Sequence, residues 1–171
     1  MIKSFFVSSL LLLCVTIVES SFLSNFAILM VVPDLILICN VYFGLLNGKI
    51  YGEASGFVSG LFLDFIMGVP LGFNSLIRVI ISYVAGLFAD FAIIKGIILP
   101  AMSAGIATII KRLLILAISF FFPKATLNPY GFISYQFLFE FIANIILAPF
   151  IFKFLSYFNR YIDIKDTKNQ L

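Results

Sequence analysis

The sequence predicts an all-α polytopic membrane protein, with six transmembrane helices in a single integral-membrane domain over residues 1–171. Its composition is the first reason: 63% of the residues are hydrophobic and only 11% are charged, whereas soluble globular chains carry about 25% charged residues. The second is that apolar stretches of about 20 residues, the length a helix needs to cross a bilayer, follow one another along nearly the whole chain. These stretches are continuous rather than alternating, which favours helices over a β-barrel. Composition therefore excludes a soluble fold.

Short segments of turn-forming and charged residues separate the six expected spans. In chain order, the spans cover residues 4–24, 27–46, 50–67, 73–94, 97–121 and 132–155. The breaks between them are Ser24-Asn25, Asn47-Gly48-Lys49, Gly68 to Gly72, Lys95-Gly96 and Pro123 to Gly131. The first span follows a lysine, as the apolar core of a signal peptide does. It runs too long for one and lacks a good small-x-small cleavage site, so we expect it to be retained.

The lysines and arginines near the span ends predict the orientation in the membrane. With the N-terminus in the cytoplasm, the cytoplasmic side collects Lys3, Lys49, Lys95, Lys153, Arg160, Lys165 and Lys168. The outer loops then hold only Lys124. We therefore expect both termini to be cytoplasmic, which also requires an even number of spans. The stretch after Tyr157 is polar enough to leave the bilayer, and we expect a solvated tail there, although it could also meet anionic headgroups.

The residue types that the chain lacks exclude several kinds of site. It has no His and no Trp, and its two cysteines, Cys14 and Cys39, lie inside apolar runs. These facts exclude a His-based triad, a Cys/His metal cluster and a disulfide framework. The net charge of +3 comes from residues at the span ends rather than from a basic domain, so nucleic acid is not an expected partner. We expect no catalytic residue, no cofactor and no metal.

Charged residues inside the expected spans are the candidates for a site, because each costs about 2.5–3.5 kcal/mol at a helix centre and needs polar surroundings. They are Glu19, Asp34, Glu53, Asp64, Arg78, Asp90, Lys111, Arg112 and Glu140. Glu53 and Asp90 lie near the cytoplasmic span ends, where neighbouring lysines can pair with them. Alternating helix direction places Glu19, Asp34 and Asp64, with Arg78 and Glu140, in the outer half of the bilayer.

Sequence position predicts two ion pairs among these charges. Asp64 ends the third span and Arg78 opens the fourth. The tight turn over residues 68–72 brings these two outer ends side by side, so we expect Asp64 to pair with Arg78. In the same way, Glu140 on the sixth span is the best partner for Arg112 on the fifth.

The third span carries a ridge of small residues. Gly52, Gly56 and Gly60 are spaced four residues apart, so they share one helix face, and Phe57 and Phe65 lie on the opposite face. Small residues at this spacing let helix backbones approach closely in a membrane. The ridge therefore predicts either packing within the chain or docking of a partner helix.

Pro33-Asp34 lies several residues into the second span, where a proline would interrupt a helix. A broken entrance at this point could line a cavity. Alternatively, Pro33 starts the helix proper at a first-turn position, which proline tolerates well. We favour a helix start at Pro33.

Three segments together resemble the MreD family of bacterial rod shape-determining membrane proteins. They are Pro33-Asp34, the stretch from Gly56-Phe57 to Gly60-Leu61, and the string Asp64-x-x-x-Gly68-x-Pro70-Leu71-Gly72. The likeness is strongest over residues 33–88, and the length, the six spans and the cytoplasmic termini agree with it. As candidates for structural or partner contacts we take Pro33, Asp34, Gly52, Gly56, Gly60, Asp64, Gly68, Pro70, Gly72, Arg78, Arg112 and Glu140.

The resemblance implies a non-enzymatic subunit of the cell-elongation machinery in the bacterial inner membrane. The partners it implies, besides membrane lipid, are the bitopic protein MreC, a SEDS glycosyltransferase with a penicillin-binding transpeptidase, and, indirectly, the MreB filament. The MreD family also resembles the S components of energy-coupling-factor vitamin transporters, which implies an S-component-like bundle. The alternative function is therefore solute binding for a vitamin transporter. Ser4, Ser8 and Ser9 stand in the first span where alanines four residues apart would be expected for that function, which disfavours it.

Overall fold

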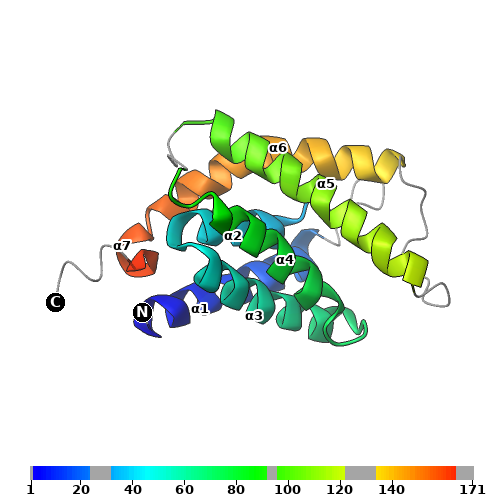
Figure 1. Cartoon of the computed structure of the whole chain (residues 1–171), viewed down its shortest axis with the longest axis horizontal. Helices are drawn as coiled ribbons and strands as arrows, with labels where there is room; N and C mark the ends of the chain where they lie inside the picture. Colours follow the sequence, from blue (N-terminus) through cyan, green and yellow to red (C-terminus); the bar gives the residue numbers. More distant parts are fainter. Residues whose placement is uncertain (1, 24–31, 92–95, 122–133, 165–171) are drawn as a thin grey trace.

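The structure, a computed structural model, describes residues 2–23, 32–91, 96–121 and 134–164. Within these ranges all regular structure is helical, which confirms the predicted all-α class (Figure 1). The elements in chain order are α1 (Ile2–Val18), the π-helical turn η1 (Glu19–Leu23), α2 (Leu35–Asn47), α3 (Lys49–Met67), α4 (Phe73–Leu87), α5 (Ile98–Phe121), α6 (Tyr135–Ser156) and α7 (Asn159–Ile162).

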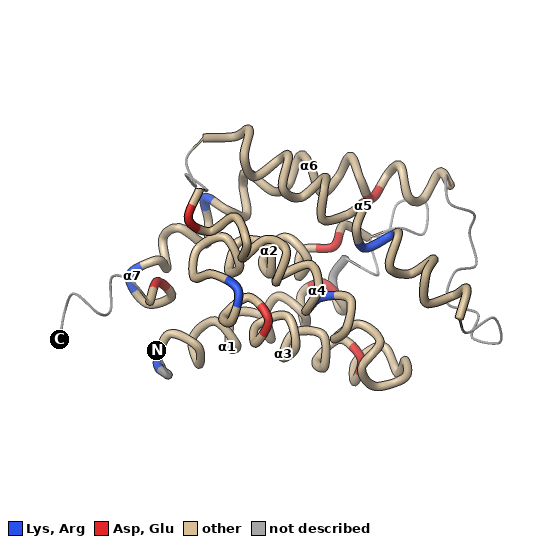
Figure 2. Tube along the Cα trace, in the orientation of Figure 1, with Lys and Arg blue, Asp and Glu red and all other residues tan. Residues whose placement is uncertain are grey.

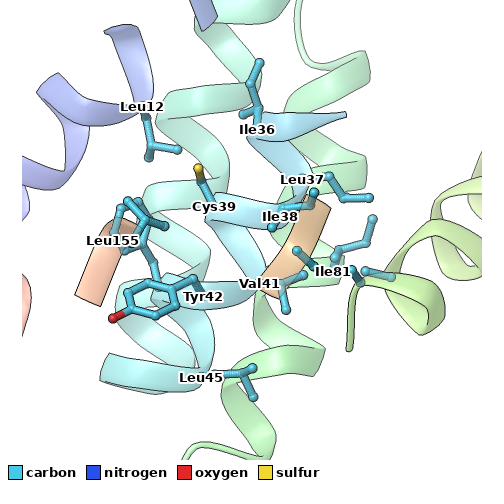
Figure 3. Close-up of a cluster of buried hydrophobic side chains, with 14 of the residues drawn as sticks. Leu12, Ile36, Leu37, Ile38, Cys39, Val41, Tyr42, Leu45, Ile81 and Leu155 are labelled. Carbon is cyan, nitrogen blue, oxygen red and sulfur yellow. The ribbon is translucent and has the colours of Figure 1, made fainter. Parts of the chain in front are cut away.

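Helix α2 lies in the middle of the bundle. It contacts α1, α3, α4, α5 and α6, and in Figure 1 the α5–α6 pair lies on one side of it while α1 and α3 lie on the other. Every residue from Ile36 to Leu45 is buried, as expected for a helix that is apolar on all sides. Figure 3 shows that Leu12, Ile81 and Leu155, which come from three other helices, pack in the core beside the side chains of α2.

Among the described residues, four helical segments are long and apolar enough to cross a membrane. They are Lys3–Ser21, Lys49–Met67, Ile98–Phe121 and Tyr135–Ser156. Helices α2 and α4 are also apolar but shorter. The structure thus supports a multi-pass membrane protein with four such helices among the described residues, and the count of six spans stays a prediction.

Two of the expected spans have helix boundaries that differ from the prediction. The second was expected over residues 27–46, but its helix begins only at Leu35, with Asp34 as the N-cap. Pro33 therefore precedes the helix instead of occupying its first turn, because the side chain of Asp34 bonds to the backbone of the first turn. The fourth was expected over residues 73–94, but α4 ends at Leu87, where the N–H of Phe88 bonds to the carbonyl of Ala85. Residues 27–31 and 92–94 lie outside the described ranges.

The segment after α6 is docked onto the bundle as far as residue 164, so the expected solvated tail is wrong for this part. The hydroxyl of Tyr42 donates to Oδ1 of Asn159, and the N–H of Ile164 donates to Oδ1 of Asn47 at 2.9 Å. Ile162 is fully buried, and α7 contacts α1. Apolar Ile162 and Ile164 drive this docking, while residues 165–171 lie outside the described part.

Candidate functional site: a buried charge network and a glycine-packed hairpin

Four charged side chains, one just before α2 and one each from α4, α5 and α6, meet inside the bundle. Figure 2 shows acidic and basic positions close together in this region. The Arg78 guanidinium donates from Nη2 to Asp34 Oδ1 at 3.1 Å. The Lys111 ammonium lies 2.6 Å from Asp34 Oδ2 and 2.7 Å from Glu140 Oε1. Asp34 and Arg78 expose only 4% and 3% of their surface. We call these four residues the charge network.

The network is built where the chain before α2 is not helical. The first N–H groups of a helix have no partner within it, and here side chains supply the acceptors. The Asp34 carboxylate accepts from the N–H of Leu37 at 2.8 Å, and the buried carboxylate of Glu19 accepts from the N–H of Ile36 at 3.0 Å. A carboxylate at this end of a helix is also favoured by the helix dipole. Asp34 therefore both starts α2 and anchors the two cations.

An amide and a hydroxyl extend the network toward α5. Asn144 Oδ1 accepts from the N–H of Asp34 at 3.0 Å, and Asn144 Nδ2 donates to Thr108 Oγ1 at 3.0 Å. Asn144 is fully buried. It ties the start of α2 to α5 and α6, a role that sequence reasoning missed. The only available signal was a lone amide in an apolar run.

The expected ion pair between Asp64 and Arg78 is wrong. The Asp64 carboxylate accepts from the backbone N–H groups of Gly72 at 2.8 Å and Asn74 at 2.9 Å, and also from the Asn74 side chain at 2.9 Å. Asp64 thus binds the unpaired N–H groups at the start of α4. Arg78 lies more than a turn further along and faces α2, so it meets Asp34 instead.

The expected pair between Arg112 and Glu140 is also wrong, because Glu140 pairs with Lys111. Neighbouring helix residues point about 100° apart, so Lys111 and Arg112 cannot both face the same carboxylate. The Arg112 guanidinium instead lies over the ring of Phe137, 5.5 Å from its centroid.

The glycine ridge of α3 is filled by α4, which favours packing within the chain over partner docking on this face. A Cβ added at Gly52 would lie 2.7 Å from the carbonyl oxygen of Ser82, and one at Gly56 would lie 2.7 Å from that of Arg78. At Gly60 it would overlap the Cα of Ser75. The α3 and α4 backbones are therefore in direct contact along the whole ridge.

The hairpin between α3 and α4 forms the predicted tight turn. Gly68 and Gly72 have φ angles of 64° and 98°, values that side chains rarely allow and glycine adopts freely. The carbonyl of Pro70 accepts from the N–H of Phe73 at 3.1 Å. The Asp-x-x-x-Gly-x-Pro-Leu-Gly string thus encodes one unit, in which two glycines reverse the chain and Asp64 caps the next helix.

Removing the Asp64 cap is expected to weaken this hairpin. Asp64→Ala should lower the free energy of unfolding by about 2 kcal/mol, since it leaves the N–H groups of Gly72 and Asn74 without their acceptor. Asp64→Asn keeps one acceptor oxygen and should cost about 1 kcal/mol. Equilibrium unfolding by dodecyl sulfate in mixed micelles measures both. Glu53→Gln on the same helix is the control, and an equal effect of Asp64→Ala and this control would contradict the capping role.

Comparison with known proteins assigns the family. The sequence model of the rod shape-determining protein MreD matches residues 2–158, which includes all described helices except the last. No curated protein and no solved structure matches the chain significantly. The match covers Pro33-Asp34, the glycine ridge and the Asp64 hairpin, and the apolar helices agree with a multi-pass membrane protein. The chain belongs to the MreD family of rod shape-determining membrane proteins.

Proposed function

We propose that this protein is a non-enzymatic subunit of the cell-elongation complex that holds an MreC-like bitopic protein beside the SEDS glycosyltransferase and the penicillin-binding transpeptidase. The MreB filament would be reached indirectly through this assembly. Membership of the MreD family supports the role in rod shape. The protein would then act through its helix surfaces and its rigidity rather than through reaction chemistry.

The observation that carries the proposal is that each charged group of the charge network has an oppositely charged partner within the network. Arg78 and Lys111 bind Asp34, and Lys111 also binds Glu140. A solute site needs polar groups that face an open cavity, but no network residue lines either of two well-formed cavities in the described part of the chain. The charges therefore lock helices together. This favours a scaffold over the vitamin-binding alternative.

The proposed location is the bacterial inner membrane, with both termini in the cytoplasm. In Figure 1 the start of α1, the connection from α2 to α3, the start of α5 and the end of α6 lie at the same end of the bundle. Lys49 and Lys153 belong to this end. Lysine and arginine collect on the cytoplasmic side of membrane proteins, which supports this orientation.

For the MreC-like helix, we propose the apolar groove between α4 and α5. Its volume is 320 Å³, and small residues such as Ala85, Ser103 and Ala107 line it together with larger apolar side chains. No charged residue lines the groove. The glycine ridge is covered by α4 and is not available to a partner. The groove is open, and its small residues allow another helix to approach closely.

Depletion tests the scaffold role directly. Cells that lose this protein should become round while vitamin uptake stays unchanged, and the full-length chain should restore the rod shape. Normal cell shape on depletion would overturn the proposal. Lost vitamin uptake with normal shape would favour the transporter alternative.

Bulky substitutions test the partner groove. Ser103→Trp should fill the groove and lower co-purification of the MreC-like protein by at least about tenfold, which corresponds to the loss of about 1.4 kcal/mol of binding free energy. Ile109→Trp, on an exposed part of the same helix outside the groove, is the matched control. Equal co-purification with both variants would move the partner contact to another face.

A further inference from the structure

A second cavity lies between the beginning of α5 and the end of α6. It has a volume of 680 Å³ and is lined by apolar side chains along most of its length, with Lys153 and Ser156 at one end. Ile97, Ile146 and Phe150 on its wall each expose more than half of their surface, so the cavity opens to the outside of the bundle. In a bilayer, that opening faces lipid. We call it the α5–α6 groove.

Helix-breaking residues keep this part of the helix pair from closing. Pro149 lies inside α6, where proline cannot donate to the carbonyl four residues before it, which is that of Ile145. Pro100 lies in the first turn of α5 and also lines the groove. Gly96, just before α5, and the small Ala101 in α5 complete this wall. The α5 and α6 surfaces therefore leave a hollow here that side chains of the bundle do not fill.

The length of the groove matches one leaflet of a membrane. Its α6 wall runs from Ile145 to Ser156, which at 1.5 Å per residue is about 16 Å. Half of the hydrocarbon core of a bilayer is about 15 Å thick. The polar end of the groove lies at the end of the bundle where α6 ends and α1 begins (Figure 1). An acyl chain in the groove would thus have its headgroup at the level of Lys153.

The charge at this end selects the kind of headgroup. Lys153 is exposed, and among the residues that the structure describes it forms no ion pair with a carboxylate. The Ser156 hydroxyl, one turn further along α6, donates to the carbonyl of Lys153 at 2.7 Å and keeps its own oxygen as a polar surface. The α4–α5 groove, in contrast, has no charged lining residue. An anion therefore suits the α5–α6 groove and not the other one.

We propose that the α5–α6 groove binds one anionic phospholipid from the leaflet on the side where α1 begins and α6 ends. An acyl chain lies against the apolar wall between Pro100 and Pro149, and the phosphate lies beside the ammonium of Lys153. Basic residues at the membrane surface attract anionic lipid in this way. This inference concerns lipid selection and is independent of the partner assignment above.

Lipid titration of the purified full-length protein in mild detergent tests the inference. Phosphatidylglycerol and phosphatidylcholine with identical acyl chains are added, and bound lipid is counted by native mass spectrometry. We expect the wild-type chain to bind phosphatidylglycerol more tightly. Lys153→Gln should weaken phosphatidylglycerol binding about fivefold, the effect of roughly one basic residue at the membrane surface, and leave phosphatidylcholine binding unchanged. Lys153→Arg should retain the preference.

Two further variants separate this site from general attraction. Lys49→Gln removes an exposed charge at the same end of the bundle but outside the groove, and it should keep the preference. Ala101→Phe fills the apolar wall and should weaken binding of both lipids. Circular dichroism and size-exclusion chromatography verify folding of each variant. An unchanged preference in Lys153→Gln, an equal loss in Lys49→Gln, or full lipid binding by folded Ala101→Phe would each overturn the inference, whatever the cell-shape result.

Discussion

Asp34→Ala is expected to have the largest effect on stability of any single substitution considered, a loss of about 3–5 kcal/mol in the free energy of unfolding. Removal of one partner from a buried ion pair leaves the other charge without compensation. Here the change leaves the buried Arg78 guanidinium without its carboxylate partner, while Lys111 loses one of its two carboxylates and keeps Glu140. It also removes the acceptor for the N–H of Leu37 at the start of α2. Asp34→Asn keeps that acceptor and should cost less.

Unfolding by dodecyl sulfate in mixed micelles measures this loss. Glu53→Ala is the control, because Glu53 forms no ion pair among the described residues, and it should stay within about 0.5 kcal/mol of wild type. The double variant Asp34→Ala/Arg78→Leu should be less destabilised than the sum of its single variants, since residues in one network couple. Strict additivity would show that the pair does not interact in the folded protein.

Gly60→Ala should be the second most damaging change, at about 3 kcal/mol. Its new methyl group would overlap the Cα of Ser75 on α4. Backbone atoms cannot rotate away as side chains can, so α3 and α4 must separate, which places the cost at the upper end of the range for overpacking. The same unfolding assay measures the cost.

Gly105→Ala is the matched control for this prediction. It makes the same chemical change in α5, where the nearest atom to the new methyl group is Ile145 Cδ1 at 3.3 Å, the movable end of a side chain. Alanine is a better helix former than glycine by about 0.8–1.0 kcal/mol, so this variant should be close to neutral or slightly stabilising. If both variants behaved alike, close contact between the α3 and α4 backbones would not be a main source of stability.

Local patterns predicted the hairpin well. The spacing of Gly52, Gly56 and Gly60 indicated close helix packing, and the Gly68–Gly72 segment indicated a tight turn. Both features depend on residues that are near each other in sequence. Small side chains allow close helix packing, and glycine allows the positive φ angles of a tight turn. The partner of the ridge, α4, is also the next helix in the chain. Sequence distance and spatial distance agree here.

Pairing across the bundle was harder to predict, because it depends on helix rotation. Arg78 pairs with Asp34, which is 44 positions away in the sequence, and not with Asp64, which is nearer in the sequence. Lys111 rather than its neighbour Arg112 met Glu140. If the residue assumed to face a neighbouring helix is wrong by one position, the predicted rotation of the helix is wrong by about 100°. In a nearly uniform apolar run, hydropathy does not determine this rotation. The acids and bases were found, but their partners were not.

The central position of α2 has a consequence for biosynthesis. Its 13 residues make a rod about 20 Å long, short of the roughly 30 Å of hydrocarbon that a lone helix must cross. While the ribosome is still making α3, α2 has α1 available but lacks α4, α5 and α6, and the Asp34 carboxylate has not yet met Arg78 or Lys111. Stable insertion of this segment therefore waits for downstream synthesis, and a nascent chain arrested before α4 emerges should leave it accessible to water-soluble thiol reagents at Cys39.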